Sequence, residues 1–415
     1  MIRFGHIHIS NYRILILCLA FLLFSNSSCK TTDQQSRTPE RMILNLTETP
    51  ATSQAVTWRT RYNVSSPQAQ LAPAIESPDF DTKALTIQAI TEHIKPDNKR
   101  GVYYHSIVFK SLEPNTTYAY RVGDGEIWSE WNQFNTASET NEPFKFVYFG
   151  DPQNNIKSIC SRIFRAAYKK APDADFWHFV GDIVNHGEID EEWAELYYAF
   201  GWIPRVTPII LLPGNHEYVK KEINGEEIRE LNHLWHPQFT LPENGPVDLK
   251  ETVYFIDYQG VRFVMLNGNE KLQEQAKWLD AVLEENSQIW TIIGIHQPLY
   301  STANERDNPY LRELFLPIFD KYSVDLVLQG HDHTYGRTYK IKNGIRVDDS
   351  EKGTVYIVSV SGPKRYLINP NYRDLMVKIG TGRQLFQVIH IIQNRLVYES
   401  FTATGELYDS FELIK

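Results

Sequence analysis

The residues that could do chemistry lie in five short polar clusters between residues 151 and 333, each directly after an apolar run. These clusters supply aspartate, asparagine and histidine side chains but no cysteine. Carboxylate, amide and imidazole ligands without a thiolate suit iron, manganese or zinc better than calcium or copper. The candidate ligands are Asp151, Asp182, Asn215, His296, His331 and His333.

This set is large enough for two metal ions. Six or seven ligands exceed the four of a single tetrahedral site. Two ions about 3.5–4 Å apart can clamp a phosphoryl group and lower the pKa of a bound water towards neutrality. One carboxylate has to bridge such a pair, because a negative bridge offsets the repulsion between two cations. The residues therefore predict a two-metal centre suited to phosphate esters.

Each cluster alone has an ordinary structural interpretation. A lone histidine at a strand end is more often structural than functional, and Gly-Asp pairs are common in turns. However, five of the 13 histidines lie in these clusters, which favours one shared site over coincidence. The five are His186, His216, His296, His331 and His333.

The apolar runs before the clusters predict strands of an α/β domain, and amphipathic stretches between them predict helices. Ligands bind at the carboxyl ends of strands in such sheets, so we expect all five clusters to meet at one sheet edge. Glycines at the ends of the runs let the chain turn sharply towards a common point. The predicted strands are 146–150, 176–181, 208–214, 291–295 and 324–330, and the predicted helices are 156–170, 272–285 and 309–322.

Residues 39–137 differ from the rest of the chain. Short runs rich in β-branched and aromatic residues, separated by turn formers, predict a β-sandwich of roughly 100 residues. A polar linker follows, and the second domain is expected at 144–415. Within it, residues 254–266 predict a hairpin, and residues 353–362 and 385–414 predict further strands.

The start of the chain predicts an export signal. A polar start with Arg3 and Arg13 comes before an unbroken apolar run over 14–24, and this run is too short to span a bilayer. A cleaved signal peptide over 1–28 is therefore expected. Small residues precede Cys29, as in bacterial lipoproteins, although Asn26 departs from that pattern and ordinary secretion is the alternative. We expect a lipid anchor at Cys29, a tether over 29–38, and a periplasmic or cell-surface location.

The composition excludes some classes of function. A net charge of -9 disfavours nucleic-acid binding through a basic surface. Of the three cysteines, only Cys160 lies beyond the leader and Cys29, so neither a disulfide framework nor a thiolate metal cluster is possible. We expect Cys160 to be a buried filler in a helix.

In order and spacing, the clusters resemble the signature blocks of the calcineurin-like metallophosphoesterases. The preceding β-domain resembles a fibronectin type III module, and the run from Gly330 to Thr338 is similar to purple acid phosphatases. The resemblance implies a metal-dependent phosphoric ester hydrolase of α/β (α+β) class, with a four-layer αββα sandwich after the β-sandwich. The blocks are Gly150-Asp151, Gly181-Asp182, Gly214-Asn215-His216-Glu217, His296 and Gly330-His331-Asp332-His333.

The resemblance also implies roles for single residues. His216 lies beside the metals without binding one, where it either protonates the leaving-group oxygen as a general acid or holds the phosphate, and a metal-bound hydroxide attacks phosphorus. Two divalent or trivalent ions (Fe, Zn or Mn) are the implied cofactors, and a small phosphorylated molecule is the implied substrate. The implied ligands are Asp151 and His333 for the first metal, Asp182 for both, and Asn215, His296 and His331 for the second.

Three positions depart from the family pattern or differ among its branches. Asn185 replaces the tyrosine that colours purple acid phosphatases, so we expect no tyrosinate–iron colour. Gln153 stands where many relatives have a histidine ligand; it either coordinates the first metal or orients a water. His186 stands where related protein phosphatases have a phosphate-binding arginine; it either contacts substrate or supports the ligands. Candidate rim residues are Tyr300, Arg306 and Tyr335, with ordinary loop surface the simpler interpretation of each.

Two alternatives to an acid phosphatase-like enzyme remain open. The same metal site could serve a phosphodiesterase or a nucleotidase. In a different class, the chain could be a surface binding protein whose β-domain binds a partner and whose metal domain has decayed. Intact candidate ligands at all five clusters argue against decay. We expect the β-domain to be a structural brace beside the active site.

Overall fold

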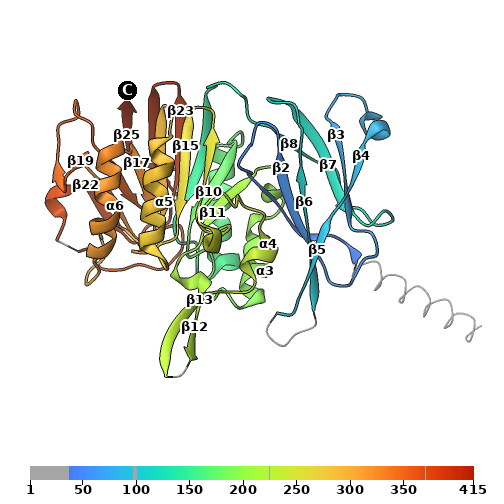
Figure 1. Ribbon diagram of the computed structural model, residues 1–415, viewed down its shortest axis with the longest axis horizontal. Helices are drawn as coiled ribbons and strands as arrows, with labels where there is room; N and C mark the ends of the chain where they lie inside the picture. Colours follow the sequence, from blue (N-terminus) through green and yellow to red (C-terminus); the bar gives the residue numbers. More distant parts are fainter. Residues whose placement is uncertain (1–36, 97–100, 224, 370) are drawn as a thin grey trace, which may run out of the picture.

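The computed structural model describes residues 37–96, 101–223, 225–369 and 371–415. The predicted leader and Cys29 lie outside this range. A small β-domain is followed by a larger α/β domain, as predicted (Figure 1). None of the helices in the described part of the chain is long and apolar enough to cross a membrane.

The N-terminal domain is a β-sandwich. One layer has the order β5-β6-β2-β1, and the other has the order β4-β3-β7-β8. Trp58, Leu71 and Phe134 belong to the core between the layers. The sequence did not predict three of the strands; two of these, β4 and β5, are only four and five residues long and mostly exposed, so neither buries an apolar face that the sequence could reveal. The strands are β1 (Glu40–Asn45), β2 (Gln54–Thr60), β3 (Gln68–Pro73), β4 (Leu85–Gln88), β5 (Ile90–Ile94), β6 (Val102–Phe109), β7 (Thr117–Gly123) and β8 (Asn132–Asn135).

One sheet runs through both domains. Its order is β25-β24-β23-β9-β10-β11-β1-β2-β6-β5. At the junction, β1 pairs in parallel with β11 through Asn45 and Ile209, and the Asn45 side chain donates to the Ile209 carbonyl at 2.8 Å. The second domain contributes β9 (Phe144–Phe149), β10 (Phe176–Val180), β11 (Ile209–Leu212), β23 (Leu385–Ile392), β24 (Arg395–Thr402) and β25 (Leu407–Ile414).

A second sheet packs face to face on the first. Its order is β14-β15-β16-β17-β21-β18-β22. The ring of Phe263 meets that of Phe146 edge-on between the sheets, with centroids 5.2 Å apart. Its strands are β14 (Tyr254–Tyr258), β15 (Val261–Leu266), β16 (Trp290–Ile295), β17 (Leu326–Gln329), β18 (Thr334–Thr338), β21 (Val355–Val358) and β22 (Met376–Thr381).

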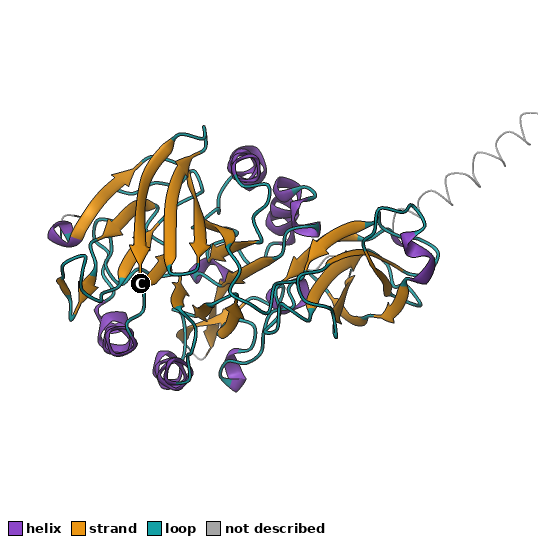
Figure 2. Ribbon diagram, turned by 90° about the horizontal axis from the view of Figure 1, so that it is seen from above, coloured by secondary structure: helices purple, strands orange, loops and turns teal. Residues whose placement is uncertain are grey.

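Helices cover the outer faces of both sheets and complete the predicted four layers (Figure 2). On the first sheet, α2 (Ser161–Lys170) and α3 (Asp190–Phe200) pack, and a π-helical segment, Ile156–Cys160, precedes α2. On the second sheet, α5 (Leu272–Glu284) and α6 (Pro309–Tyr322) pack. Cys160 is fully buried, as predicted, and its thiol donates to the Pro152 carbonyl.

A hairpin that the sequence did not predict extends from the second domain directly after the Asn215–Glu217 turn (Figure 1). It consists of β12 (Tyr218–Ile223) and β13 (Glu226–Leu231). Charged residues interrupt its apolar alternation, so the strand signal is weak. The remaining short elements are α4 (Trp235–Gln238), β19 (Ile341–Lys342) and β20 (Ile345–Arg346).

The β-domain holds the start of α3. Arg41 Nη1 and Arg59 Nη1 contact the Asp190 carboxylate at 2.6 and 3.0 Å, and Asp190 is the first residue of α3. An acidic residue there also interacts favourably with the helix dipole. These largely buried ion pairs tie the β-domain to the segment that follows His186.

Candidate metal centre

The five polar clusters meet between two sheets. Asp151, Asp182 and Asn215 follow β9, β10 and β11 of the first sheet, whereas His296 and His331 follow β16 and β17 of the second. The expectation of a single sheet edge was therefore wrong. The carboxyl ends of strands from the two stacked sheets lie side by side, and each sheet contributes part of the ligand set.

The side chains form two groups that share one residue. Asp182, His296 and His331 form one group, and Asp151, Asp182 and His333 form the other; within each, the candidate ligand atoms lie within 4.8 Å of one another. Asp182 belongs to both groups, which is the position required of a bridging carboxylate. This arrangement suits two ions rather than one.

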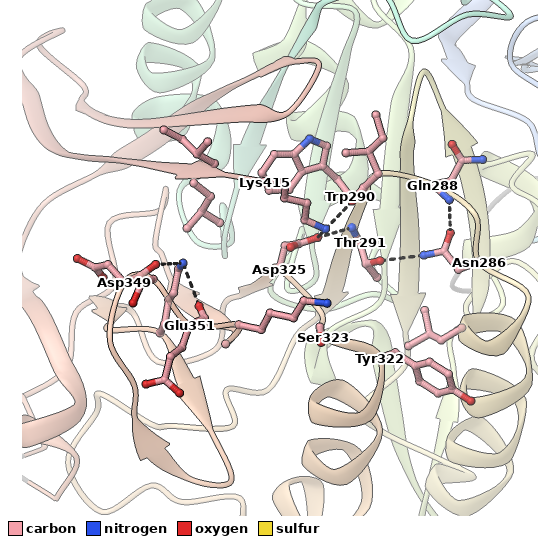
Figure 3. A pocket seen from close by; sticks show the side chains of 18 of the residues that line it. Asn286, Gln288, Trp290, Thr291, Tyr322, Ser323, Asp325, Asp349, Glu351 and Lys415 are labelled. Atoms are coloured by element: carbon pink, nitrogen blue, oxygen red, sulfur yellow. Dashed lines mark hydrogen bonds and ion pairs between the residues drawn. The ribbon is translucent and has the colours of Figure 1, made fainter.

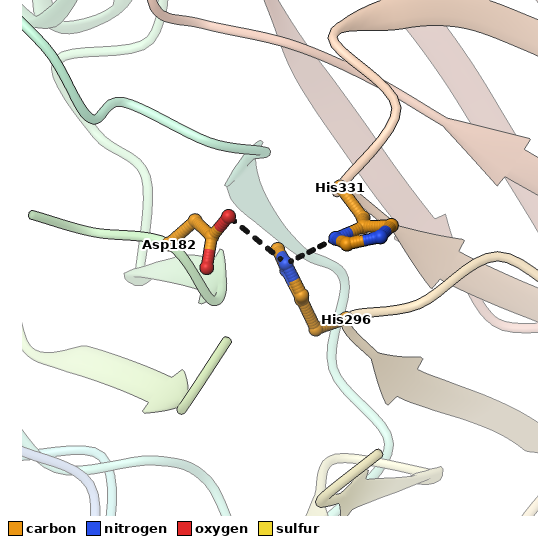
Figure 4. A group of neighbouring side chains, drawn as sticks. All are labelled: Asp182, His296 and His331. Carbon is orange, nitrogen blue, oxygen red and sulfur yellow. Dashed lines mark hydrogen bonds and ion pairs between the residues drawn. The ribbon is translucent and has the colours of Figure 1, made fainter. Parts of the chain in front are cut away.

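In the second-metal group, His296 lies between its partners (Figure 4). Its Nε2 is 3.2 Å from Asp182 Oδ2 and 3.2 Å from His331 Nδ1. Its Nδ1 donates to the Val180 carbonyl at 2.8 Å, which holds the ring and leaves Nε2 as the metal-binding nitrogen.

Unpartnered oxygens indicate that these residues fit metal ions. The buried atoms Asp151 Oδ2 and Asn215 Oδ1 have no hydrogen-bond partner among the described residues. Buried polar atoms are nearly always paired, so orphaned oxygens on two candidate ligands fit a site that binds a cation. The oxygen and imidazole donors match iron, zinc or manganese.

The protonation of the histidines also suits metal binding. Burial lowers the pKa of His331, and burial with the nearby Lys364 charge lowers the pKa of His333 to about 3, so both imidazoles are neutral at pH 7. Burial opposes protonation of His296, but the carboxylates of Asp182 and Asp151 raise its pKa to about 9. A metal therefore has to displace a proton there.

The backbone at four of the ligands adopts a left-handed conformation. The φ angles are 41° at Asp151, 48° at Asp182, 69° at His331 and 48° at His333. Such residues store strain that the surrounding structure has to hold, and they concentrate at functional sites. This backbone aims the side chains away from the strands and towards the centre.

Two glycines of the blocks are required by close approach. A Cβ on Gly214 would lie 2.2 Å from Asp182 Oδ1, and a Cβ on Gly330 would lie 2.2 Å from Asp151 Oδ1. Any side chain at either position would therefore displace a candidate ligand. Glycine is therefore required at these two positions for steric reasons, and not only because the chain turns there.

Sequence reasoning assigned no role to two buried acids that hold the ligands. Glu217 accepts backbone N–H bonds from Asp182, Ile183, Val184 and Gly214. Asp332 accepts bonds from Ser301, Thr302 and Ala303, which ties the His331–His333 segment to the loop after His296. Their positions inside the Asn-His-Glu and His-Asp-His blocks were the only available signal.

His216 lies at the edge of the centre. Its Nδ1 donates to the Asn185 carbonyl at 2.6 Å, while its Nε2 lies 3.9 Å from Asp182 Oδ2. The side chain is about a quarter exposed, so Nε2 can be reached from outside. A histidine oriented in this way can present a proton next to the bridging carboxylate without being a ligand.

His186 and Asn185 face a different set of partners. His186 Nδ1 contacts Glu192 Oε1 at 2.7 Å, and the Asn185 side chain bonds to Asn154 and His186. In the described part of the chain, none of these contacts joins either side chain to a candidate metal ligand. Substrate contact by His186 stays a prediction.

The candidate rim residues separate into two kinds. Tyr300 and Tyr335 are only 3% and 1% exposed, so neither forms a rim or an ordinary loop surface; both belong to the core. The sequence did not predict their burial, because each tyrosine follows a polar cluster in what looks like a loop. Arg306 is half-buried, and its Nη1 donates to the His331 carbonyl at 2.9 Å, beside the metal centre.

A cavity of about 710 Å³ lies away from these ligands (Figure 3). Its lining includes Trp290 and Thr291 at the start of β16, and Asp325 just before β17. It therefore opens at the amino ends of the strands, opposite the metal centre. Asp325 is ion-paired there with Lys415 at 2.8 Å. In the described part of the chain, no candidate metal group lies among the residues that line the cavity, so the cavity does not belong to the site.

Comparisons with known proteins agree with this geometry. The family described as "Calcineurin-like phosphoesterase" matches residues 144–335, and "Purple acid Phosphatase, N-terminal domain" matches residues 39–136. An acid phosphatase type 7 of Danio rerio is 25% identical over 368 residues, which cover 76% of this chain and 78% of that protein. A probable inactive purple acid phosphatase of Arabidopsis thaliana is 24% identical over 421 residues, covering 86% and 66%.

A solved structure shares the fold. The purple acid phosphatase from yellow lupin (Lupinus luteus) seeds superposes with a TM-score of 0.77 at 21% identity. The match covers 91% of this chain and 74% of the lupin chain, and thus both domains.

Proposed function

The chain belongs to the calcineurin-like phosphoesterases of the purple acid phosphatase type and is a phosphoric ester hydrolase. We propose that it hydrolyses small phosphate esters at the site centred on Asp182. The observation that carries this proposal is the sharing of Asp182 by two ligand groups. Two metal ions bound there would neutralise phosphoryl charge and lower the pKa of a water molecule.

The chain's own residues position the reaction. Asp151 and His333 would hold the first metal, Asn215, His296 and His331 would hold the second, and Asp182 would serve both. His216 is the proposed general acid: its Nδ1 is fixed by the Asn185 carbonyl, and its accessible Nε2 gives a proton to the leaving-group oxygen.

Gln153 is the proposed additional ligand of the first metal. Its amide nitrogen lies 2.8 Å from Asp182 Oδ2 and 3.3 Å from His333 Nε2, two atoms of the same group. Its oxygen is buried and unpartnered. Since the two ends of an amide occupy nearly the same space, the oxygen can face the cation by rotation of the side chain.

Replacing Asp182 by Asn tests the proposal. An amide cannot provide a negative bridge, so Asp182→Asn should lose bound metal and at least about 100-fold in turnover of para-nitrophenyl phosphate. Asp173→Asn, at a surface carboxylate paired with Lys145, is the control and should keep both. A variant Asp182→Asn with two tightly bound metals and ordinary turnover would contradict the proposal.

Substrate preference separates the remaining candidates. Assays on para-nitrophenyl phosphate and on its bis-ester distinguish a monoesterase from a phosphodiesterase. A metal-replete sample without activity on any ester would instead support a binding protein; the Arabidopsis relative is itself named a probable inactive purple acid phosphatase. The converged ligand set favours an active enzyme.

We also propose export and anchoring through a lipid on Cys29. The apolar run over 14–24 and the small residues before Cys29 support this proposal. Cys29→Ala expressed in a bacterial host should move the protein from the membrane fraction to the soluble fraction and abolish fatty-acid labelling. Unchanged fractionation and labelling would contradict it.

A further inference from the structure

Two cations flank an aromatic ring beside the metal centre. Arg306 Cζ lies 4.7 Å, and Lys364 Nζ 5.4 Å, from the centroid of the Tyr366 ring. That ring in turn packs edge-on against His333, with centroids 5.0 Å apart at 89°. We call Arg306, Lys364 and Tyr366 the cationic ledge. It adjoins a proposed ligand of the first metal.

Two loops build the ledge. Arg306 lies between β16 and α6, and Lys364 and Tyr366 lie between β21 and β22. The loops are joined where the Asn304 amide donates to the Leu367 carbonyl at 2.8 Å and where the Asn369 side chain donates to the Arg306 carbonyl at 3.2 Å. The ledge therefore has a fixed place relative to the centre.

The charges of the ledge are not neutralised by the protein. Within the described residues, neither Arg306 nor Lys364 makes an ion pair, whereas the neighbouring Arg312 is paired with Asp307 at 2.5 Å. The buried Asp332 carboxylate feels the charge of Arg306 but is already bonded by Ser301 and backbone N–H groups. In a chain of net charge -9, two unpaired cations beside the centre remain available for an anion.

We propose that the cationic ledge binds a second phosphate group of the substrate, next to the phosphate held at the metal centre, and so selects bisphosphorylated substrates. The inference rests on the proposed phosphatase function. Arg306 uses one N–H for the His331 carbonyl, which leaves other guanidinium donors for phosphate oxygens. Lys364 adds a point charge, and both side chains are common phosphate binders.

A purely structural ledge predicts a different outcome. If the two cations only held the Tyr366 ring against His333, their loss would disturb metal binding by His333. It would then lower the activity on every substrate alike. A substrate-binding ledge acts only on substrates that carry the second phosphate. The ratio of two activities distinguishes these cases.

The test uses propane-1,3-diol phosphate and propane-1,3-diol bisphosphate, which differ by one phosphate. The metal-loaded wild-type protein should have the higher kcat/KM on the bisphosphate. Lys364→Gln changes a side chain that makes no hydrogen bond within the described residues. It should lower the bisphosphate-to-monophosphate ratio about tenfold or more, mainly through KM. Arg306→Gln should act in the same direction. Metal content is measured for each variant.

Lys352→Gln is the matched control, because it removes one lysine charge at the cavity on the opposite edge. It should leave the ratio unchanged. If Lys364→Gln left the ratio unchanged, or lowered kcat/KM equally on both substrates, phosphate binding by the cationic ledge would be refuted. The proposed phosphatase function would still stand. A metal-loaded wild type that cleaves neither these substrates nor para-nitrophenyl phosphate would overturn both.

Discussion

Glu217→Gln tests whether one buried carboxylate positions the bridging ligand. Glu217 Oε2 accepts the N–H groups of Asp182 and Gly214 at 2.9 and 2.7 Å, and Oε1 accepts those of Ile183 and Val184 at 2.8 and 3.2 Å. Glutamine has the same shape but only one acceptor oxygen. Its NH2 end would face two N–H donors.

The cost follows from these two unpaired donors. A buried N–H group without an acceptor costs about 1–3 kcal/mol, hence about 2–6 kcal/mol for two. Burial raises the pKa of Glu217 to about 7, so the carboxylate itself is expensive to keep ionised, and the neutral amide recovers part of the loss. We expect a net destabilisation of about 2–4 kcal/mol.

The larger effect should fall on the metal site. Asp182 has a left-handed backbone, and Glu217 accepts hydrogen bonds from the N–H groups of Asp182 and of the next residue, Ile183. Loss of these hydrogen bonds lets the Asp182 carboxylate move. Residues that support ligands typically change metal affinity or activity about 10–100-fold. We expect a loss of this size in metal affinity and in kcat/KM on para-nitrophenyl phosphate.

The assay compares urea unfolding of the metal-free protein with metal content after dialysis and with turnover. Glu251→Gln is the matched control: this mostly buried carboxylate accepts the Leu241 N–H and contacts His236, away from the ligands. It should lose stability but keep its metals. If Glu217→Gln kept metal affinity and turnover within twofold of wild type, the positioning role of Glu217 would be refuted.

Three further outcomes are expected. Gln153→Ala should weaken the first metal about tenfold in metal titrations and Gln153→His should restore it; equal affinity in all three proteins would exclude coordination by Gln153. Iron-loaded protein should show no intense visible charge-transfer band, since Asn185 replaces tyrosine, and a purple sample would contradict this. Burial lowers the pKa of His105 from the ordinary 6.5 to about 4, so this histidine takes up a proton more readily in the unfolded chain and stability falls as the pH drops. Between pH 7 and 5 this one group lowers the free energy of unfolding by about 2 kcal/mol. His105→Gln should remove this contribution, and an unchanged pH dependence of the free energy of unfolding would refute it.

Local patterns in the sequence were sufficient for the strands that carry the ligands, for the main helices, and for the ligand types. The amphipathic stretch at 309–322 forms α6 (Pro309–Tyr322), and the apolar runs form β9, β10, β11, β16 and β17. Apolar periodicity is a local property, because burial of one face is required wherever the element packs. The identity of the donors also needs no tertiary information, since the side chains themselves decide which metals suit them.

Some features were decided only by long-range packing. The distribution of the ligands over two sheets, the continuation of one sheet across the domain boundary at Asn45 and Ile209, and the burial of Tyr300 and Tyr335 all depend on contacts between distant segments. Such contacts leave no periodic signal in either partner. A polar linker could thus be recognised, but not the pairing that bridges it.

The same division holds within the metal centre. The sequence by itself determined which residues could bind two metals and that they follow strands. The resemblance already implied that Asp182 serves both metals, and its place in both ligand groups agrees with this. Only the tertiary structure decided that Glu217 and Asp332 hold the ligands, and that Arg306 and Lys364 lie beside the ring that packs on His333. The physical reason is that left-handed backbone and unpaired charge are tolerated only where the surrounding fold holds them, and that fold is assembled from segments far apart in the chain.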